Sequence, residues 1–285
     1  MKTIQLTALL LTAACPVFTP AEAIAEDWKS SAINPVANPL FFESPLIESE
    51  ARPLFIYHNI DDDFIGGFAR VYALQLRWAV TERLAIIATK DGYVQTRSDA
   101  LSDEDGWADI AAGLKYALID RPDDQFILTP GVKFELPTGQ TRVFQGNGDG
   151  EFDVFVSSMK GFDQFHVTGS VGARLPVNWS EETSSLHYSL QLDYQTCKYF
   201  TPFVVMNGFT VLSEADGPAF GKIEGYDLIN FGASDAGGRT QITAGLGFRS
   251  RVWEHLDLGV AYESGVNNPK GLFDTRFTLD ARIPF

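Results

Sequence analysis

The stretch FDTRFTLDARIPF, residues 273–285, decides the fold class. From Phe273 to Phe285 its odd-numbered positions are apolar, apart from one threonine, and its even-numbered positions carry four charges. Successive side chains of a β-strand point to opposite faces, so this pattern predicts a strand with one apolar and one charged face. A soluble β-sandwich would bury the apolar face in a core, whereas a membrane barrel would turn it toward lipid.

Two features favour the barrel over the sandwich. Phe285 is an aromatic last residue that follows alternating apolar positions, and this resembles the C-terminal assembly signal of bacterial outer-membrane barrels. The connections between strand-like stretches also alternate between short and long, as the periplasmic turns and external loops of transmembrane barrels do. We therefore expect an all-β chain that forms a transmembrane antiparallel β-barrel of bacterial outer-membrane type.

The sorted connections set the number of strands at about twelve, with both ends of the barrel chain in the periplasm. Most of these stretches alternate apolar and polar residues with a period of two, and no amphipathic helical stretch interrupts them. The expected strands cover residues 53–60, 68–80, 84–95, 109–118, 126–136, 152–159, 165–175, 186–194, 200–211, 240–249, 256–263 and 273–285.

The N-terminal region has the layout of a secretory signal peptide over residues 1–25. Lys2 supplies the positive charge, a short apolar stretch follows, and small residues permit cleavage after Ala23 or Ala25. Lipidation at Cys15 is the alternative reading of this region. Residues 26–52 are rich in proline and asparagine, which predicts an extended periplasmic arm before a barrel domain of residues 53–285.

The remaining composition narrows the class of partner. No apolar run after the signal is long enough for a transmembrane helix, which needs about 20 residues. The formal net charge of −15 argues against nucleic acid, whose phosphates need a basic surface. No histidine and cysteine cluster has metal-ligand spacing, so neither a metal nor a cofactor is expected. The expected partners are outer-membrane lipid, the barrel-assembly machinery and a small-molecule solute, with the oligomeric state left open.

The phase of the strands predicts which charged side chains line the lumen. Both signs are interleaved, which favours ion pairs that brace the interior over a ladder of one sign that selects ions. The predicted lumen-lining residues are Arg77, Asp109, Lys115, Lys133, Glu135, Arg174, Asp193, Arg249, Asp257, Glu263, Asp274, Arg276, Asp280 and Arg282.

An enzymatic barrel would need a histidine within reach of a carboxylate and a nucleophile. Pairing of the strands at 165–175 and 186–194 would bring His166 close to Asp193, but no serine stands beside them in the sequence. We therefore interpret the pair as structural and predict no enzymatic activity and no catalytic residues.

Several short motifs together resemble the outer-membrane barrel family described as putative phenol meta-pathway (phenol degradation) transporters. They are Trp78 to Leu84, Gly106 to Ile110 with Gly113 to Tyr116, Phe134 to Gly139, and Gly146 to Gly148. The resemblance implies a porin-like channel in the cell outer membrane that transports small, hydrophobic or aromatic molecules. The alternative is a closed structural or surface-interaction barrel with an ion-pair-filled lumen and no transport. Substrate identity, transport direction and whether the lumen is open or plugged stay open at this point.

Overall fold

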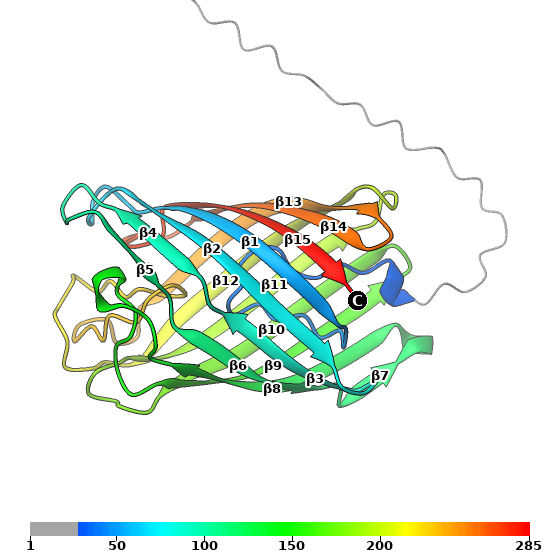
Figure 1. The fold of residues 1–285 in the computed structure, drawn as a ribbon, viewed down its shortest axis with the longest axis horizontal. Helices are drawn as coiled ribbons and strands as arrows, with labels where there is room; N and C mark the ends of the chain where they lie inside the picture. Colours follow the sequence, from blue (N-terminus) through cyan, green and yellow to red (C-terminus); the bar gives the residue numbers. More distant parts are fainter. Residues whose placement is uncertain (1–27) are drawn as a thin grey trace, which may run out of the picture.

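All strand pairings are antiparallel in a computed structural model that describes residues 28–285 (Figure 1). Three short 3-10 helices interrupt the connections: η1 (Trp28–Ser30), η2 (Pro122–Asp124) and η3 (Thr141–Val143). The strands are β1 (Glu50–Asn59), β2 (Phe68–Ala79), β3 (Leu84–Lys90), β4 (Tyr93–Arg97), β5 (Glu104–Trp107), β6 (Ile110–Tyr116), β7 (Ile119–Arg121), β8 (Phe126–Leu136), β9 (Glu151–Phe162), β10 (Phe165–Pro176), β11 (Ser184–Tyr194), β12 (Thr201–Ser213), β13 (Thr240–Trp253), β14 (Leu256–Gly265) and β15 (Thr275–Pro284).

The sheet closes on itself because β1 pairs with both β2 and β15. The fifteen segments make twelve full-length strands, as the sequence predicts, because five of the segments combine into two strands. β3 and β4 follow each other along one strand and both pair with β2, while β5, β6 and β7 follow each other along the next. Closure removes the two open edges that a flat sheet of these strands would have, and within residues 28–285 pairing on one side only is confined to the short segments β5 and β7.

The break between β3 and β4 lies at Asp91 and Gly92. There the Asp91 carboxylate takes the place of a backbone partner and accepts a hydrogen bond of 2.9 Å from the Leu74 amide. Gly92 has a φ of +117°, and a Cβ at this position would lie 2.5 Å from the Tyr72 carbonyl oxygen. Only glycine fits this close approach between the two parts of the wall.

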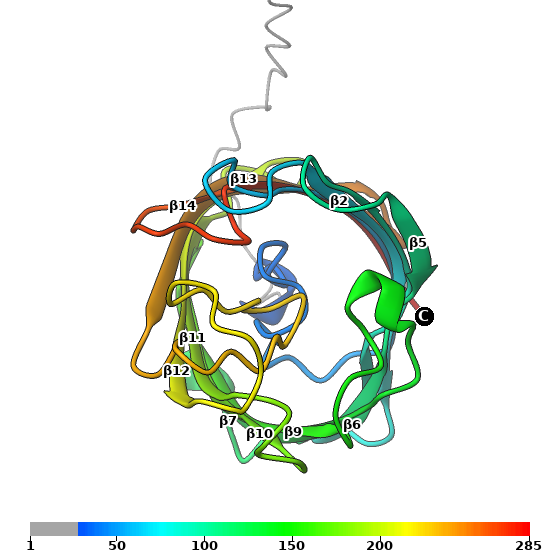
Figure 2. The same ribbon diagram turned by 90° about the vertical axis from the view of Figure 1, so that its left-hand side faces the viewer.

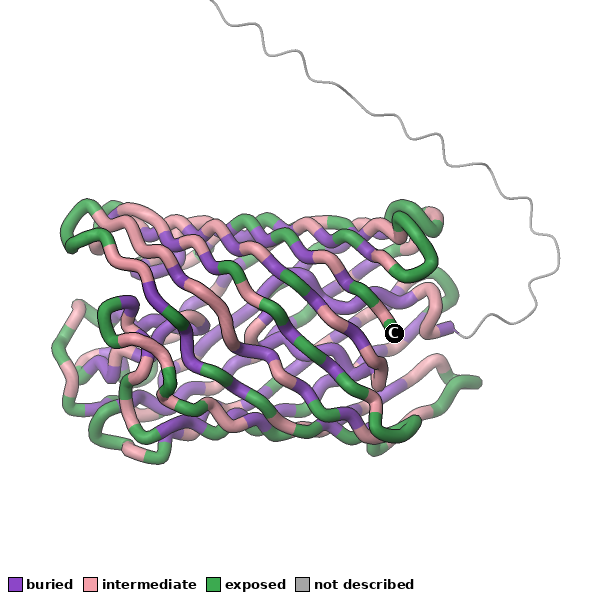
Figure 3. Tube along the Cα trace, in the orientation of Figure 1, coloured by how far each residue is buried: buried purple, intermediate pink, exposed green. Residues whose placement is uncertain are grey.

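Buried and exposed residues alternate along the strands (Figure 3). Many of the buried residues are polar, whereas large apolar side chains are exposed on most strands. On β11, for example, His187 and Asp193 are at most 1% exposed, whereas Leu190 is 43% exposed. Exposed aromatic residues stand near both rims, with Trp78 and Trp253 at one end and Trp107 and Trp179 at the other. The outer surface is thus an apolar belt between two aromatic bands, as in membrane barrels.

Long and short connections lie at opposite ends of the barrel (Figure 1). We call these the long-loop end and the short-turn end. The described N-terminal residues and the C-terminus both lie at the short-turn end. The short turns cover residues 80–83, 122–125, 163–164, 195–200 and 254–255, and the long loops cover residues 60–67, 98–103, 137–150, 177–183, 214–239 and 266–274.

Residues 28–49, the inner segment, lie inside the barrel (Figure 2). The prediction of a periplasmic arm at residues 26–52 is therefore corrected for the part that the structure describes, and β1 begins at Glu50, three residues before the expected position. Proline keeps the segment out of any ladder, so its carbonyl groups need other donors. Wall side chains supply them: Arg52 Nη2 to Pro35 O (2.8 Å), Gln75 Nε2 to Pro39 O (2.7 Å), Lys133 Nζ to Leu40 O (2.7 Å), Lys115 Nζ to Ser44 O (2.7 Å) and Thr129 Oγ1 to Pro45 O (2.7 Å).

Apolar contacts complete the packing of the inner segment. Val36 and Phe42 are at most 1% exposed and belong to one buried cluster with Phe203 of β12. Leu46 packs in a second cluster with Met159 of β9. Burial of side chains of this size stabilises the segment in the lumen by about 1.5–3 kcal/mol for each fully buried residue.

The expected signal peptide, its cleavage sites and Cys15 lie outside the described residues, and their assignments stay predictions. No helix within residues 28–285 is long and apolar enough to cross a membrane.

Candidate functional site

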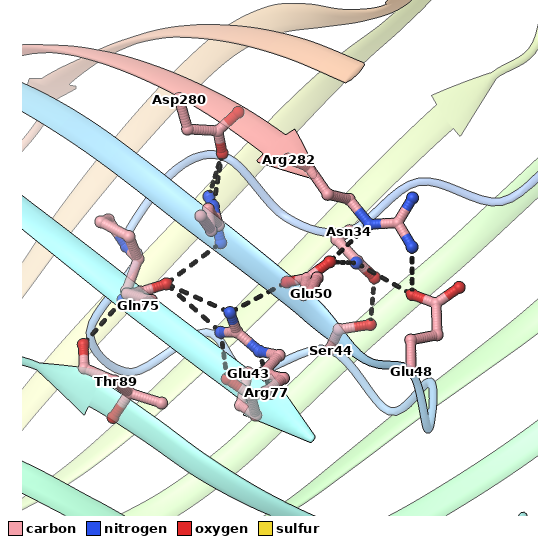
Figure 4. A network of polar contacts seen from close by, with 12 residues as sticks. Asn34, Glu43, Ser44, Glu48, Glu50, Gln75, Arg77, Thr89, Asp280 and Arg282 are labelled. Carbon is pink, nitrogen blue, oxygen red and sulfur yellow. Dashed lines mark hydrogen bonds and ion pairs between the residues drawn. The ribbon is translucent and has the colours of Figure 1, made fainter. Parts of the chain in front are cut away.

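A network of buried ion pairs joins the inner segment to β1, β2, β6, β13 and β15. Figure 4 shows the part of it around Glu43, Glu50 and Asp280. Glu43 of the inner segment holds two wall cations, and Asp280 holds two arginines. Each of these groups loses its hydration inside the barrel, so the pairing is what makes its burial tolerable. The pairs are Arg77 with Glu43 (2.6 Å), Lys115 with Glu43 (2.7 Å), Arg77 with Glu50 (3.0 Å), Arg249 with Asp280 (2.9 Å), Arg52 with Asp280 and Arg282 with Glu50.

A second group of ion pairs lies closer to the long-loop end. Here Asp227, in the loop between β12 and β13, reaches into the barrel and binds Arg276 of β15. The loop is therefore fastened to the wall by a buried pair. The other pairs are Arg174 with Glu151 (2.6 Å), Lys133 with Asp153 (2.8 Å), His187 with Asp153 (2.8 Å) and Lys90 with Glu135.

Most of the residues predicted to line the lumen have buried side chains on the inner face. Glu135 is less enclosed, with 16% of its side chain exposed. The twelve that are less than 10% exposed are Arg77, Asp109, Lys115, Lys133, Arg174, Asp193, Arg249, Asp257, Glu263, Arg276, Asp280 and Arg282.

Asp274 lies outside this group. It precedes β15, its side chain is 33% exposed, and it pairs with Lys270 in the loop of residues 266–274. Phe273, expected on the lipid face, is 4% exposed and packs edge-on against His58. The strand alternation stops at Thr275 because the loop folds over the mouth of the barrel, so the phase read from β15 does not extend to these two residues.

Several charged residues of the network were missed by the sequence analysis. Glu43 lies in a stretch with no period, and Glu50 and Arg52 precede the expected start of the first strand. Asp227 lies in the longest loop, with no local signal for burial. Asp153 stands in an alternating strand, and its position opposite Lys133 in the β8–β9 register was the signal that could have identified it.

A serine, a histidine and an aspartate meet at the short-turn end. Ser31 Oγ lies 3.1 Å from His166 Nε2, and His166 Nδ1 lies 2.8 Å from Asp193 Oδ1. The order is that of a hydrolase triad. The Ser31 hydroxyl, however, donates to Trp28 O at 2.7 Å, and the backbone amides of Ser31 and Ala32 both donate within the same turn. The adjacent amides are thus committed and do not form an oxyanion hole. We interpret the contact as an anchor that fastens the inner segment to β10 and β11.

Glu182, in the loop of residues 177–183, is a buried acid near Glu151. Burial and the neighbouring Glu151 carboxylate raise the pKa of Glu182 to about 8. Its Oε2 atom has no hydrogen-bond partner within residues 28–285. The side chain is therefore protonated over much of the neutral range, which lessens its repulsion with Glu151.

An apolar cavity of about 300 Å³ lies at the long-loop end. The cavity size is at the lower limit of typical ligand pockets. A smaller apolar space of about 40 Å³ adjoins it and shares Ala69, Thr96, Leu228 and Ile229 as lining residues. Together the two form an apolar path from the loops to Leu54 and Val71 on the inner face of β1 and β2. The remaining apolar lining of the larger cavity comes from Ile60, Ile65, Leu101, Phe144, Phe231 and Leu272.

Within residues 28–285, no group of three or more histidine, cysteine, aspartate or glutamate side chains is arranged to hold a metal ion.

A closed barrel of twelve antiparallel strands, with an apolar belt outside and charges inside, is the fold of bacterial outer-membrane barrels. Solved structures of that class are similar to this chain. An outer-membrane channel from Pseudomonas putida F1 matches with a TM-score of 0.65 at 14% identity, over 89% of this chain and 100% of the channel. The NanC porin matches with a TM-score of 0.52 at 7% identity, over 83% and 100%.

The translocator domain of the autotransporter NalP from Neisseria meningitidis also matches, with a TM-score of 0.52 at 12% identity, over 85% of this chain and 90% of that domain. No family model and no curated protein matches the sequence. At these identities the likeness establishes the fold, and the resemblance to phenol meta-pathway transporters stays a prediction.

Proposed function

We propose that this protein is an outer-membrane channel that transports small hydrophobic or aromatic molecules. In this proposal the long-loop end faces outward and the short-turn end faces the periplasm, following the usual asymmetry of bacterial barrels. The similarity to channel and porin structures supports the class of function.

The observation that carries the substrate class is the apolar cavity at the long-loop end. A polar solute would lose more hydration there than the few polar lining side chains can replace, since most of the lining side chains are apolar. A small aromatic or aliphatic molecule instead gains about 25 cal/mol for each Å² of apolar surface that it buries. The cavity therefore favours apolar over polar solutes.

The inner segment stands across the path of any solute that leaves the cavity. Glu43, Lys115 and Arg77 fill the middle of the barrel with charges that are at most 3% exposed. Transport in this proposal requires the inner segment to shift within the lumen. Packed interiors respond by discrete rearrangement and not by gradual widening, so we expect conductance in steps.

The second candidate function is a closed structural or surface-interaction barrel. The occupied lumen favours it, because the ion pairs satisfy the inner charges without any solute. The two candidate functions differ in one measurable property, which is whether a solute crosses the membrane through the barrel.

Reconstitution of the purified protein tests the proposal. Planar bilayers should show discrete conductance steps, and proteoliposomes with lipopolysaccharide in the outer leaflet should take up a fluorescent aromatic probe faster than empty ones. Uptake of a sugar of similar size should be much slower. Absence of both conductance and probe uptake would leave the closed barrel as the function.

A further inference from the structure

A polar cavity of about 320 Å³ lies at the short-turn end, between the inner segment and strands β13 to β15. It shares no lining residue with the apolar cavity at the long-loop end. Arg249, Arg251 and Arg282 contribute guanidinium groups, and Glu48 and Asp257 contribute carboxylates that pair with some of them.

Two of these arginines have unused donors. Arg249 is 3% exposed, and its Nε and Nη2 atoms donate to Asn34 O and to Asp280, but its Nη1 atom has no partner within residues 28–285. A buried donor without a partner is destabilising, so a ligand that supplies an acceptor would be stabilised there. Arg251 donates from Nε to Asp257 at 3.2 Å, which leaves its two terminal nitrogens without a hydrogen bond in the described chain.

The strand geometry places the two guanidinium groups on one face. Arg249 and Arg251 are two residues apart on β13, so their side chains leave the sheet on the same side. Gly259 lies opposite Arg249 in the β13–β14 register, and the absence of a side chain there leaves room for the Arg249 guanidinium. Both arginines line the larger cavity and a small space of about 10 Å³ beside it.

The surrounding residues define what kind of anion fits. The lining has one formal positive charge in excess, which a monoanion neutralises and a dianion would reverse. Its four basic residues are Lys29, Arg249, Arg251 and Arg282, and its three acidic residues are Glu48, Glu254 and Asp257. The apolar part of the lining comes from Ala32, Ile33 and Leu46 of the inner segment, which stand among polar residues of that segment, and from Pro284 at the end of β15. A planar carboxylate can take hydrogen bonds from a guanidinium fork while an attached apolar body contacts these apolar side chains.

We propose that the cavity is a binding site for a small monocarboxylate with an apolar body, held by Arg249 and Arg251. The proposal goes beyond the transport function, because binding at this site requires no passage through the barrel. It gives the short-turn mouth a ligand preference different from that of the apolar cavity at the long-loop end.

Calorimetric titration of the full barrel in detergent at low ionic strength tests the site, with sodium benzoate as the probe. We expect saturable binding that weakens as salt is added, because added salt screens partly exposed charges. Benzyl alcohol, which has a similar apolar body without the charge, should bind at least ten times more weakly. Equal binding of the two probes would show that the arginines do not recognise the ligand and would overturn the proposal.

Arg251→Gln is the informative variant, because Asp257 keeps Arg282 as a partner and folding should be retained. Benzoate affinity should fall at least tenfold. Arg121→Gln is the matched control, since Arg121 is an exposed arginine of β7 that lines neither of these two spaces. The benzoate affinity of this variant should equal that of the native protein. Three results would each refute the site. They are no saturable binding of benzoate to the native protein, unchanged benzoate affinity in Arg251→Gln, and tighter binding of inorganic phosphate than of benzoate.

Discussion

Lys115 Nζ on β6 lies 2.7 Å from Glu43 Oε1 on the inner segment, and neither side chain is more than 2% exposed. The two residues are 72 positions apart in the sequence. The same ammonium group also donates to Ser44 O at 2.7 Å. One wall cation therefore binds both a charge and the backbone of the segment that occupies the lumen, so the contact is one of those that hold that segment in place.

Lys115→Met should loosen the inner segment without opening the wall. The Glu43 carboxylate would keep Arg77 as a partner, so the loss should be below the roughly 3–5 kcal/mol typical of breaking an isolated buried pair. We expect a destabilisation of about 1–3 kcal/mol, measured by heat-induced loss of folded mobility in gels. Conductance in planar bilayers should rise because the segment is less firmly held.

The double variant Lys115→Met with Glu43→Gln is the matched control for the charge. It removes both charges of this pair, and because Glu43→Gln also takes a partner from Arg77, the control is read by additivity: the loss in the double variant should be smaller than the sum of the losses in the two single variants. A double variant that is less stable than the sum of the two single changes would contradict a direct pairing between these groups.

The strands could be predicted from the sequence, but the contents of the lumen could not. Alternation reveals which face of a strand is apolar, and it identified inward residues such as Lys115 and Asp280 from local pattern alone. The inner segment has no period, because its prolines exclude regular ladders, and its partners lie on distant strands. Its position follows from carbonyl groups that need donors, and only the closed barrel brings those donors together.

The phase of an alternating strand is also reliable only where the strand continues. Asp274 and Phe273 continue the pattern of β15 in the sequence, but in the structure they belong to a loop that folds over the mouth. Ser31 shows a related limit, because nothing near His166 and Asp193 in the sequence indicates that a serine from the inner segment joins them.

Ser31→Ala should weaken the anchor at the short-turn end. The variant removes two hydrogen bonds of the Ser31 hydroxyl, one to Trp28 O and one with His166 Nε2, a loss of about 0.5–1.5 kcal/mol for each. We expect faster cleavage within residues 28–49 by a protease added to the detergent-solubilised barrel, with the strands remaining intact. Ser30→Ala is the control on the same turn and should be cleaved at the native rate. Ester hydrolysis by the native protein that is lost in Ser31→Ala would contradict the structural interpretation of the triad.

Glu182→Gln should change how stability depends on pH. The folded pKa of about 8 lies above the unfolded value of 4.5, so folded protein retains a proton that the unfolded chain releases between these two values. The free energy of unfolding of the native protein should therefore fall as pH rises through this window, and the fall should be complete above about pH 8.

The variant lacks this ionisation and should not show that decline. After allowance for partial exposure, we expect the difference to reach about 1–2 kcal/mol at pH 8.5 and to vanish near pH 4. Thermal unfolding at a series of pH values measures it. Glu181→Gln, at the exposed neighbouring position, should follow the native profile, and parallel profiles of Glu182→Gln and native protein would refute the assignment.

Ala69→Leu should narrow the apolar path at the long-loop end. Ala69 is 6% exposed and lines both the cavity of about 300 Å³ and the smaller space that adjoins it. A larger side chain can enter the cavity with little strain on the wall, so the barrel should fold. Uptake of an aromatic probe in proteoliposomes should fall severalfold. Ala112→Leu, at an exposed position on the outer face of β6 and outside this lining, is the control for the substitution and should leave probe uptake near the native rate.

Deletion of Phe285 should prevent assembly in cells without preventing folding in detergent. The Phe285 ring is 75% exposed, so it contributes little packing, and its backbone amide donates to Ser49 O at 3.1 Å. Loss of one such contact at the rim costs about 0.5–1.5 kcal/mol, too little to unfold a closed barrel. A severe loss of folded protein from the outer membrane would then reflect recognition of the terminal aromatic ring during assembly. Phe285→Tyr keeps the ring and should assemble normally, whereas normal membrane levels of the deletion variant would refute the assembly role.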